Sequence, residues 1–329
     1  MSNIRGRERT MLNSYAKQLT LAGASAAILL ASTFVARADD QKFPPRGKTN
    51  INLAVASNFY GAPPSNSAIT DLISAFVAAN PRYTVTVVDN GATATLAGRI
   101  INGNSLKVDL FLAADTETPQ DLLINHFSLV APYNASFTPP LYTFNYATGI
   151  LAFLSNTPGV DVSCESGTCG YDPNVYKTVA IADPSLAPYG VAAQTVLTGR
   201  YGLMAPLSSN PLVHEYPNIT ATFDAVIAET DPVGFVAMSA ICSMGSYPTA
   251  GNGTSALAYF SIGSGTQPGT IVNNYNPLTQ AGIPIRNHRT PAQNVELEDF
   301  VAFLTDFTTS PMPDSPMITT LKKFCYNAP

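Results

Sequence analysis

The sequence contains no tryptophan and only three histidines, and charged residues make up 12% of the chain. Proline and glycine are frequent by comparison, with 26 and 22 residues. A chain with few charges and many turn-forming residues is typical of a compact, loop-rich α/β protein.

Basic residues are scarce beyond the first 38 positions. That segment holds five of the 17 Lys and Arg residues and one of the 22 acids, so the remainder has 12 basic and 21 acidic residues. The resulting net charge, near −9, argues against a nucleic-acid partner, which requires a basic surface. If the protein binds an anion, local dipoles have to attract it.

The N-terminal segment has the pattern of a secretory signal peptide. Four basic side chains precede an apolar run at 19–35, which ends in the small-x-small site Ala36-Arg37-Ala38. We therefore predict a signal peptide over 1–38 and a polar, proline-rich linker over 39–48. The alternative is an uncleaved membrane anchor, but Gly, Ser and Thr interrupt the run. The remaining 291 residues are typical of two modest lobes.

Motifs of common enzymes are missing. The sequence has no Gly-x-Ser-x-Gly, no His-Glu-x-x-His, no P-loop and no full dinucleotide fingerprint. His126, His214 and His288 each stand in a polar or turn context, which favours surface positions over a catalytic base. We predict a protein without catalytic residues or a cofactor, and an exported enzyme is the less favoured alternative.

The four cysteines are an even number in a chain predicted to be exported, which favours disulfides. Cys164 and Cys169 flank a short loop that could hold a local bridge, in which case Cys242 and Cys325 pair. A metal site is the alternative, although the spacing does not match zinc ligands and the histidines are scattered.

Apolar runs that predict strands alternate with amphipathic segments that predict helices. The predicted strands are 51–56, 83–88, 109–114, 150–154, 179–182 and 233–237. The predicted helices are one capped by Ser67 and ended by Asn80-Pro81, one through Leu96 and Ile100, and others at 191–199, 219–229 and around 297–307. This alternation predicts mainly parallel sheets with crossover helices, and we expect long loops over 245–285.

Three polar or turn segments follow predicted strands and stand at or near predicted helix starts: Ser57, Thr93 and Pro188-Tyr189-Gly190. A helix N-terminus offers free N–H groups and partial positive charge, so it can hold an anion without Lys or Arg. The alternative is ordinary capping, because Ser and Thr are common N-caps.

Five segments also resemble, in order, the bacterial periplasmic molybdate-binding proteins, the soluble component of a molybdate importer. They are Ala54-Val-Ala-Ser57, Gly91-Ala-Thr-Ala-Thr-Leu-Ala-Gly-Arg-Ile100, Asp109-Leu-Phe-Leu-Ala-Ala-Asp115, Ala182-Asp-Pro-Ser-Leu-Ala-Pro-Tyr-Gly190 and Pro232-Val-Gly-Phe-Val-Ala237. The resemblance covers residues 50 to 240, and 95–115 is its most specific part.

The resemblance implies an α/β fold like that of type II periplasmic binding proteins, with two lobes, a ligand cleft between them and a hinge that the chain crosses twice. The implied domains are 49–145 and 238–329 for the first lobe and 146–237 for the second, with crossings near 143–148 and 237–241. It further implies a periplasmic monomer that captures molybdate or tungstate and delivers it to the membrane permease of an ABC importer. A different oxyanion or a small organic anion is the alternative ligand.

Carried over by position, the implied ligand-binding residues are Ser57, Thr93, Tyr189, Ile219 and Ala237. In the family, hydroxyls and main-chain N–H groups bind molybdate, so the only metal expected is the one within the oxyanion. Ser57 and Thr93 keep a hydroxyl, whereas Ala237 replaces a binding tyrosine of the family. We hypothesise that Tyr189 supplies from another position the hydroxyl that Ala237 lacks.

Overall fold

The computed structural model describes residues 49–61, 66–133, 138–162, 171–172, 174–203, 206–243, 255–260, 271–272 and 275–329. All of them fall in one compact unit, Lys48–Pro329. The predicted signal peptide, the linker up to residue 48, Cys164 and Cys169 lie outside the described residues.

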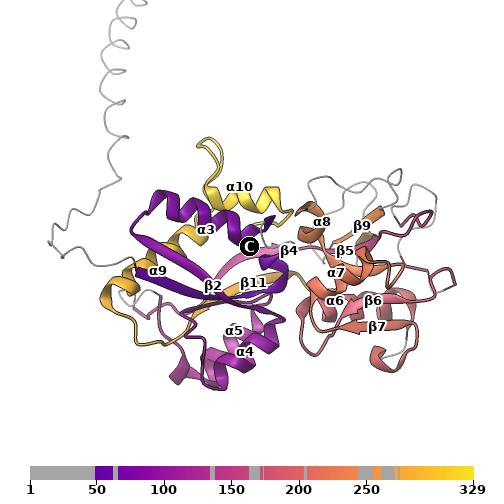
Figure 1. The fold of residues 1–329 in the computed structure, drawn as a ribbon, viewed down its shortest axis with the longest axis horizontal. Coiled ribbons are helices and arrows are strands. Elements are labelled where there is room, and N and C mark those ends of the chain that lie inside the picture. Colours follow the sequence, from indigo (N-terminus) through magenta and orange to yellow (C-terminus); the bar gives the residue numbers. More distant parts are fainter. Residues whose placement is uncertain are drawn as a thin grey trace, which may run out of the picture. The chain divides into compact units, whose positions relative to one another are not determined.

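The first sheet has five strands in the order β2-β1-β3-β11-β4. Figure 1 labels β2, β4 and β11 of this sheet. They are β1 (Thr49–Ala56), β2 (Tyr83–Gly91), β3 (Leu110–Leu112), β4 (Phe144–Gly149) and β11 (Leu278–Pro284). β1 pairs in parallel with β2 and β3, while β11 runs antiparallel between β3 and β4. The carboxyl ends of β1 and β3 therefore meet at one edge, as in other parallel α/β sheets.

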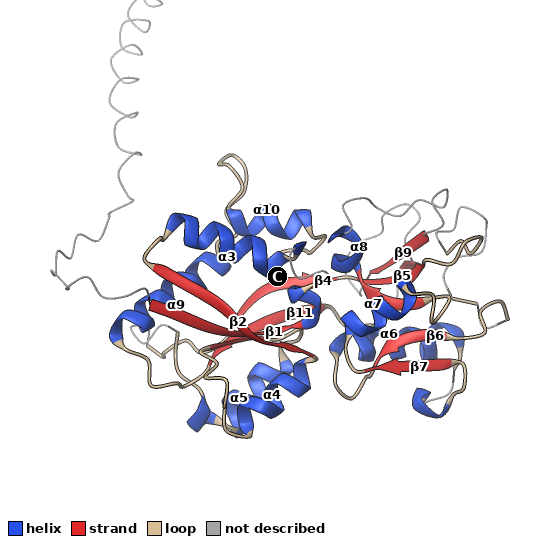
Figure 2. Ribbon diagram, in the orientation of Figure 1, coloured by secondary structure: helices blue, strands red, loops and turns tan. Residues whose placement is uncertain are grey.

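The second sheet has six strands in the order β10-β9-β5-β8-β6-β7. They are β5 (Leu151–Ser155), β6 (Val179–Ala182), β7 (Val213–Tyr216), β8 (Gly234–Ala237), β9 (Ser255–Phe260) and β10 (Ile271–Val272). Every residue of β5, β6 and β8 is buried, because helices cover the central strands on both faces (Figure 2).

The helices are α2 (Ser57–Tyr60), α3 (Ala68–Ala79), α4 (Thr93–Ile101), α5 (Glu117–Asn125), α6 (Pro188–Tyr201), α7 (Ile219–Ile227), α8 (Met238–Ser243), α9 (Pro291–Leu304) and α10 (Pro316–Lys323). Short 3-10 turns occupy Phe127–Leu129 and Leu207–Ser209. Within the described residues, no helix is both long and apolar enough to cross a membrane.

Each sheet has its own hydrophobic core. α3, α9 and α10 pack on one face of the first sheet through Leu72, Phe300 and Leu321, and α4 and α5 pack on the other through Leu96 and Leu122. α6 and α7 contribute to two further clusters around the second sheet. The predicted α/β architecture with two lobes is thus confirmed.

The sheets divide the chain differently from the predicted domain limits. β4 extends the first sheet to Gly149, and the first crossing falls at Ile150 instead of 145/146. β9 and β10 belong to the second sheet, although we expected 238–329 to lie in the first lobe. The reason is that β9 pairs antiparallel with β5, so the return to the first sheet comes only between β10 and β11.

Two local predictions also need correction. The helix expected at 191–199 begins at Pro188, because proline is well tolerated at the first helical position, where its missing N–H is not needed. The loops expected over 245–285 include β11, the strand that joins β3 to β4.

Candidate functional site

Ser57 and Thr93 do not cap helices. Ser57 is the first residue of α2 and Thr93 the first of α4, and the N-cap positions before them are Ala56 and Ala92. The cap of α6 is likewise an alanine, Ala187. Because alanine has no polar side chain, the first-turn N–H groups of these helices lack the usual partner.

Four of the other described helices are capped in the ordinary way. Ser67, Asn218, Thr290 and Ser315 each accept a hydrogen bond from the first turn of α3, α7, α9 and α10. The alternative of ordinary capping, left open by the sequence, is therefore wrong for Ser57 and Thr93. An alanine at the N-cap position was the signal that could have separated the two groups of helices.

The N-termini of α2, α4 and α6, which lack a capping side chain, lie close together. Ala56, Ala92 and Ala187 belong to one buried cluster, which also contains Tyr189, Ile219 and Ala237. The Thr220 hydroxyl on α7 donates to the Ser57 carbonyl over 3.1 Å, and Ala94 N–H on α4 donates to the Leu186 carbonyl over 3.1 Å. The structure thus brings the segments of all five predicted residues together from both sheets.

The Thr93 hydroxyl is oriented by the end of β3. It is 1% exposed, and its Oγ1 accepts a hydrogen bond from Ala114 N–H over 3.1 Å. Since this bond uses the oxygen as acceptor, the hydroxyl proton remains free to be donated to a ligand. Ser57 is also buried, with 4% exposure, at the end of β1.

Tyr189 is the largest predicted residue, and it reaches the first sheet. Its side chain is 1% exposed, and a Cβ added to Gly149 on β4 would lie 2.0 Å from the Tyr189 Oη. Burial raises the pKa of Tyr189 well above its usual value, and the nearby Asn58 side chain opposes this rise. In the described part of the chain no group makes a bond of hydrogen-bonding geometry with this Oη.

A separate cavity of about 440 Å³ opens beside this cluster. It is lined by the start of α4, the end of β3, the first turns of α5 and α6, and residues 275–279. Ser57, Thr93, Tyr189, Ile219 and Ala237 do not line it, although their neighbours Ala94 and Pro188 do. The predicted residues are therefore closed off in this conformation, and the open space lies next to them.

The cavity is acidic. Asp115 and Glu117 line it, and burial raises the pKa of Asp115 to about 6 in spite of hydrogen bonds from the Thr118 N–H and hydroxyl. In the sequence, Asp115 stands out only as the last residue of the segment Asp109–Asp115 that resembles the molybdate-binding proteins. Its Asx-type contact with Thr118 also stabilises the start of α5.

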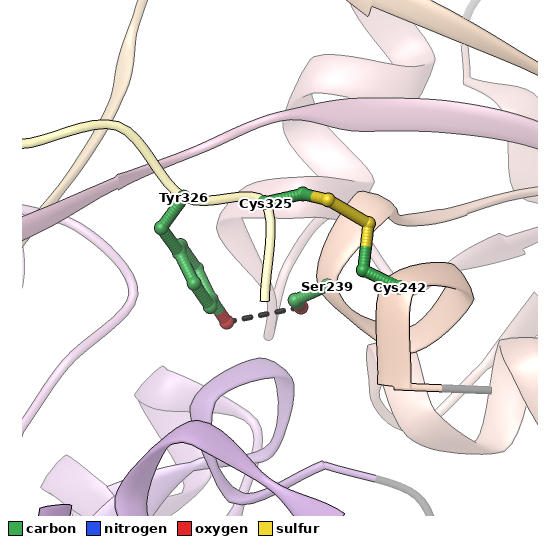
Figure 3. Close-up of a disulfide and its surroundings, with 4 residues drawn as sticks. All are labelled: Ser239, Cys242, Cys325 and Tyr326. Carbon is green, nitrogen blue, oxygen red and sulfur yellow. Dashed lines mark hydrogen bonds between the residues drawn. A yellow bond between two sulfur atoms is a disulfide. The ribbon is translucent and has the colours of Figure 1, made fainter. Parts of the chain in front are cut away.

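The C-terminal tail touches the Ser57 loop. Cys325 forms a disulfide with Cys242 on α8, which confirms that predicted pair (Figure 3). The adjacent Tyr326 hydroxyl lies 2.9 Å from the Asn58 carbonyl and 3.1 Å from Asn58 Nδ2. The sequence analysis did not single out Asn58 or Tyr326, and no local pattern marks them.

His126 and His214 lie on different elements of the fold. His126 follows the last residue of α5, and His214 Nδ1 lies 2.7 Å from the buried Asp231 carboxylate. Over the residues whose placement is described, no group of three or more His, Cys, Asp or Glu side chains could hold a metal ion.

The chain is similar in sequence to known solute-binding proteins. The model of the bacterial extracellular solute-binding protein family matches residues 57–308. The molybdate-binding protein ModA of Azotobacter vinelandii is 30% identical over 204 residues, which cover 62% of this chain and 70% of that protein.

Solved structures show the same fold. A periplasmic molybdate-binding protein of Azotobacter vinelandii aligns with a TM-score of 0.58 at 19% identity, over 85% of this chain and 99% of its own. The substrate-binding domain of a molybdenum ABC transporter protein of Clostridium difficile, described as putative, aligns with a TM-score of 0.52 at 17% identity, over 86% and 100%. The fold is that of type II periplasmic binding proteins, and the chain belongs to the bacterial extracellular solute-binding protein family.

Proposed function

We propose that this protein captures a tetrahedral oxyanion, with molybdate or tungstate as the first candidates, and delivers it to the permease of an ABC importer. The observation that carries the proposal is the convergence of α2, α4 and α6, which start at alanine caps, beside the hydroxyls of Ser57 and Thr93. Relatedness to a molybdate-binding protein supports the same ligand class.

Neutral donors suffice for such a ligand. A doubly charged oxyanion held by five to eight donors would gain ~1.5–3 kcal/mol from each charge-assisted bond. First-turn N–H groups of α4, α6 and α7, including those of Tyr189 and Ile219, would supply donors together with the Ser57 and Thr93 hydroxyls. Donors without a counter-charge also fit the acidic balance of the chain, with 22 acids against 17 bases.

We also propose that Tyr189 contributes its hydroxyl. Ala237 ends β8 with a methyl group only, and the Tyr189 Oη is buried without a hydrogen bond from the described residues. A buried hydroxyl that makes no hydrogen bond costs free energy, so a ligand oxygen that accepts its proton would be favoured.

The proposal is tested by melting the protein with molybdate, tungstate, sulfate, phosphate and small organic acids. A ligand at about a thousand times its Kd should stabilise the protein by ~4 kcal/mol, which raises the Tm clearly. Ser57→Ala and Thr93→Val should weaken binding, while Thr93→Ser, which keeps the hydroxyl, should bind nearly as the parent does. Absence of a shift with every oxyanion would remove the proposal.

Tyr189→Phe tests the phenol separately. If it leaves the oxyanion Kd unchanged while Ser57→Ala abolishes binding, Tyr189 does not contribute its hydroxyl. The phenylalanine keeps the ring, whose Cζ also lies near Gly149, so most of the packing is preserved while the hydroxyl is lost.

A small organic solute is the second candidate, and the cavity of about 440 Å³ favours it. That volume lies in the range of small-molecule sites and exceeds the need of a single tetrahedral ion. A ligand in this cavity would have to offer a donor to Asp115 or Glu117. Its binding would respond to Asp115→Asn and be indifferent to Ser57→Ala, the reverse of the pattern expected for an oxyanion.

A further inference from the structure

Gln280 lies on β11, and its side-chain amide is buried. The amide oxygen has a hydrogen-bond partner among the described residues, whereas the amide nitrogen makes no bond of full hydrogen-bonding geometry there. Gln280 is 0% exposed, and its Oε1 lies 3.0 Å from the Tyr146 hydroxyl. Its Nε2 is also buried and makes no bond of full hydrogen-bonding geometry with the described residues, although the Tyr326 phenol lies near the Gln280 side chain. Buried polar groups in native proteins nearly always find a partner, so this nitrogen calls for an explanation.

A second unmatched atom, the Tyr189 Oη, lies close by. A Cβ added to Gly149 would be 2.0 Å from the Tyr189 Oη and 2.9 Å from Gln280 Nε2. The two atoms are therefore at most about 5 Å apart, the sum of these distances. They approach from different sheets, Tyr189 from α6 beside the second and Gln280 from β11 in the first (Figure 1).

The Gln280 amide nitrogen and the Tyr189 hydroxyl could both donate to a hydrogen-bond acceptor. The Gln280 NH₂ can only donate, and the Tyr189 hydroxyl has a proton to donate. One atom that accepts two hydrogen bonds would satisfy both groups. An oxygen of a fully deprotonated oxyanion accepts only, whereas a protonated oxygen would bring a further donor.

Tyr146 connects Gln280 with the binding residues described above. Its hydroxyl lies 2.8 Å from the Ala113 carbonyl as well as 3.0 Å from Gln280 Oε1. The next residue, Ala114, donates its N–H to Thr93 Oγ1. The Gln280 amide thus lies beside Tyr146, whose single proton is donated to either the Ala113 carbonyl or Gln280 Oε1, and the Ala113–Ala114 peptide links Tyr146 to Thr93.

We propose that Gln280 is a ligand-contacting, specificity-determining residue: Gln280 Nε2 and Tyr189 Oη donate to the same oxygen of the bound oxyanion. The inference rests on the proposed oxyanion function and adds a residue to it. Both donors are closed off from solvent, so the ligand reaches them when α6 and β11 separate. Reclosure without a ligand leaves two donors unmatched, which makes the closed form depend on the ligand.

The test compares the parent protein with Gln280→Met, Gln280→Glu and the control Gln120→Met, using molybdate, tungstate and sulfate in calorimetry and thermal melts. Methionine keeps the length and removes the amide, while glutamate keeps an oxygen for Tyr146 and removes the N–H groups. Gln120 is exposed on α5 and does not line the cavity, so its variant makes the same side-chain change away from the site.

We expect the Kd of Gln280→Met to rise about tenfold or more, with a larger rise for Gln280→Glu and none for Gln120→Met. A parent-like Kd for both Gln280 variants overturns the inference alone. A parent protein that binds none of the three oxyanions overturns the proposed function and this inference together.

Discussion

The Tyr326 hydroxyl lies 3.0 Å from the Ser239 Oγ, one residue beyond the disulfide that joins Cys325 to Cys242 (Figure 3). Two adjacent residues of the tail therefore attach to α8. Tyr326 packs in the core of the first sheet, whereas Met238, Ala240 and Ile241 of α8 pack with the second. The tail thus joins the two cores next to the Ser57 loop.

Tyr326→Phe should lower both stability and oxyanion affinity. The variant keeps the edge-on contact with Phe59, whose ring centroid is 5.4 Å away, but leaves the Asn58 carbonyl and amide without the phenol. We expect a loss of about 1–3 kcal/mol in the free energy of unfolding, measured by urea denaturation. Tyr83→Phe, which removes a partly buried hydroxyl bonded to Asp299, is the control and should leave the Kd unchanged.

Removal of the Cys242–Cys325 disulfide should destabilise the protein by ~4 kcal/mol, because the bridge closes a loop between residues 83 apart in sequence. The double variant Cys242→Ser/Cys325→Ser should melt well below the parent under oxidising conditions. Added reductant should bring the parent toward the variant. Equal melting temperatures for the oxidised parent and the double variant would contradict this prediction.

Gly149→Ala should displace the Tyr189 phenol. The new methyl carbon would lie 2.0 Å from the Tyr189 Oη, and overpacking of this kind costs roughly 1–3 kcal/mol. In a Tyr189→Leu background the same substitution should cost much less, since the phenol is gone. A double-mutant cycle in urea measures the coupling, and additive effects would mean that the two residues do not meet.

Asp115→Asn should change the pH dependence of stability. The folded-state pKa of Asp115 is raised to about 6, so the folded state favours the protonated carboxyl. This carboxyl therefore lowers the free energy of unfolding as pH rises from about 4 to about 6, by on the order of 3 kcal/mol once ionised. The asparagine variant, which can still accept from Thr118 N–H, should gain stability over the parent across this window.

Urea denaturation at several pH values measures this gain. Asp121→Asn, at an exposed position of the same helix, controls for the loss of one charge. A constant difference between Asp115→Asn and the parent from pH 4 to pH 7 would show that Asp115 titrates normally.

Elements with strong local signals were predicted well. α3 begins at the Ser67 cap and ends at Asn80, as its spacing and the following proline indicated. The buried strands β1, β6 and β8 were recognisable from their apolar runs. α10, by contrast, was not predicted, because Pro316–Lys323 is only eight residues long, although the Ser315 cap and the buried Met317, Ile318 and Leu321 were local signals for it.

β11 shows why other elements escaped prediction. Its sequence, LTQAGIP, contains glycine and proline and has no clean alternation. It is a strand because β3 and β4, distant in sequence, offer hydrogen-bonding edges on both of its sides. The stabilisation from this pairing depends on β3 and β4, so the residues of β11 alone do not predict the strand.

The sequence by itself determined the strands and helices with strong periodicity, because residue type and spacing encode them. The segments that carry Ser57, Thr93, Tyr189, Ile219 and Ala237 came from the family resemblance, and the Cys242–Cys325 pair was one of the alternatives open for the four cysteines. The tertiary structure determined which residues those segments contact. It made Ala56, Ala92 and Ala187 the caps, and it placed Tyr189 against Gly149 and Gln280. These contacts depend on the packing of two sheets, whose strands come from both ends of the chain, and no short segment specifies that packing.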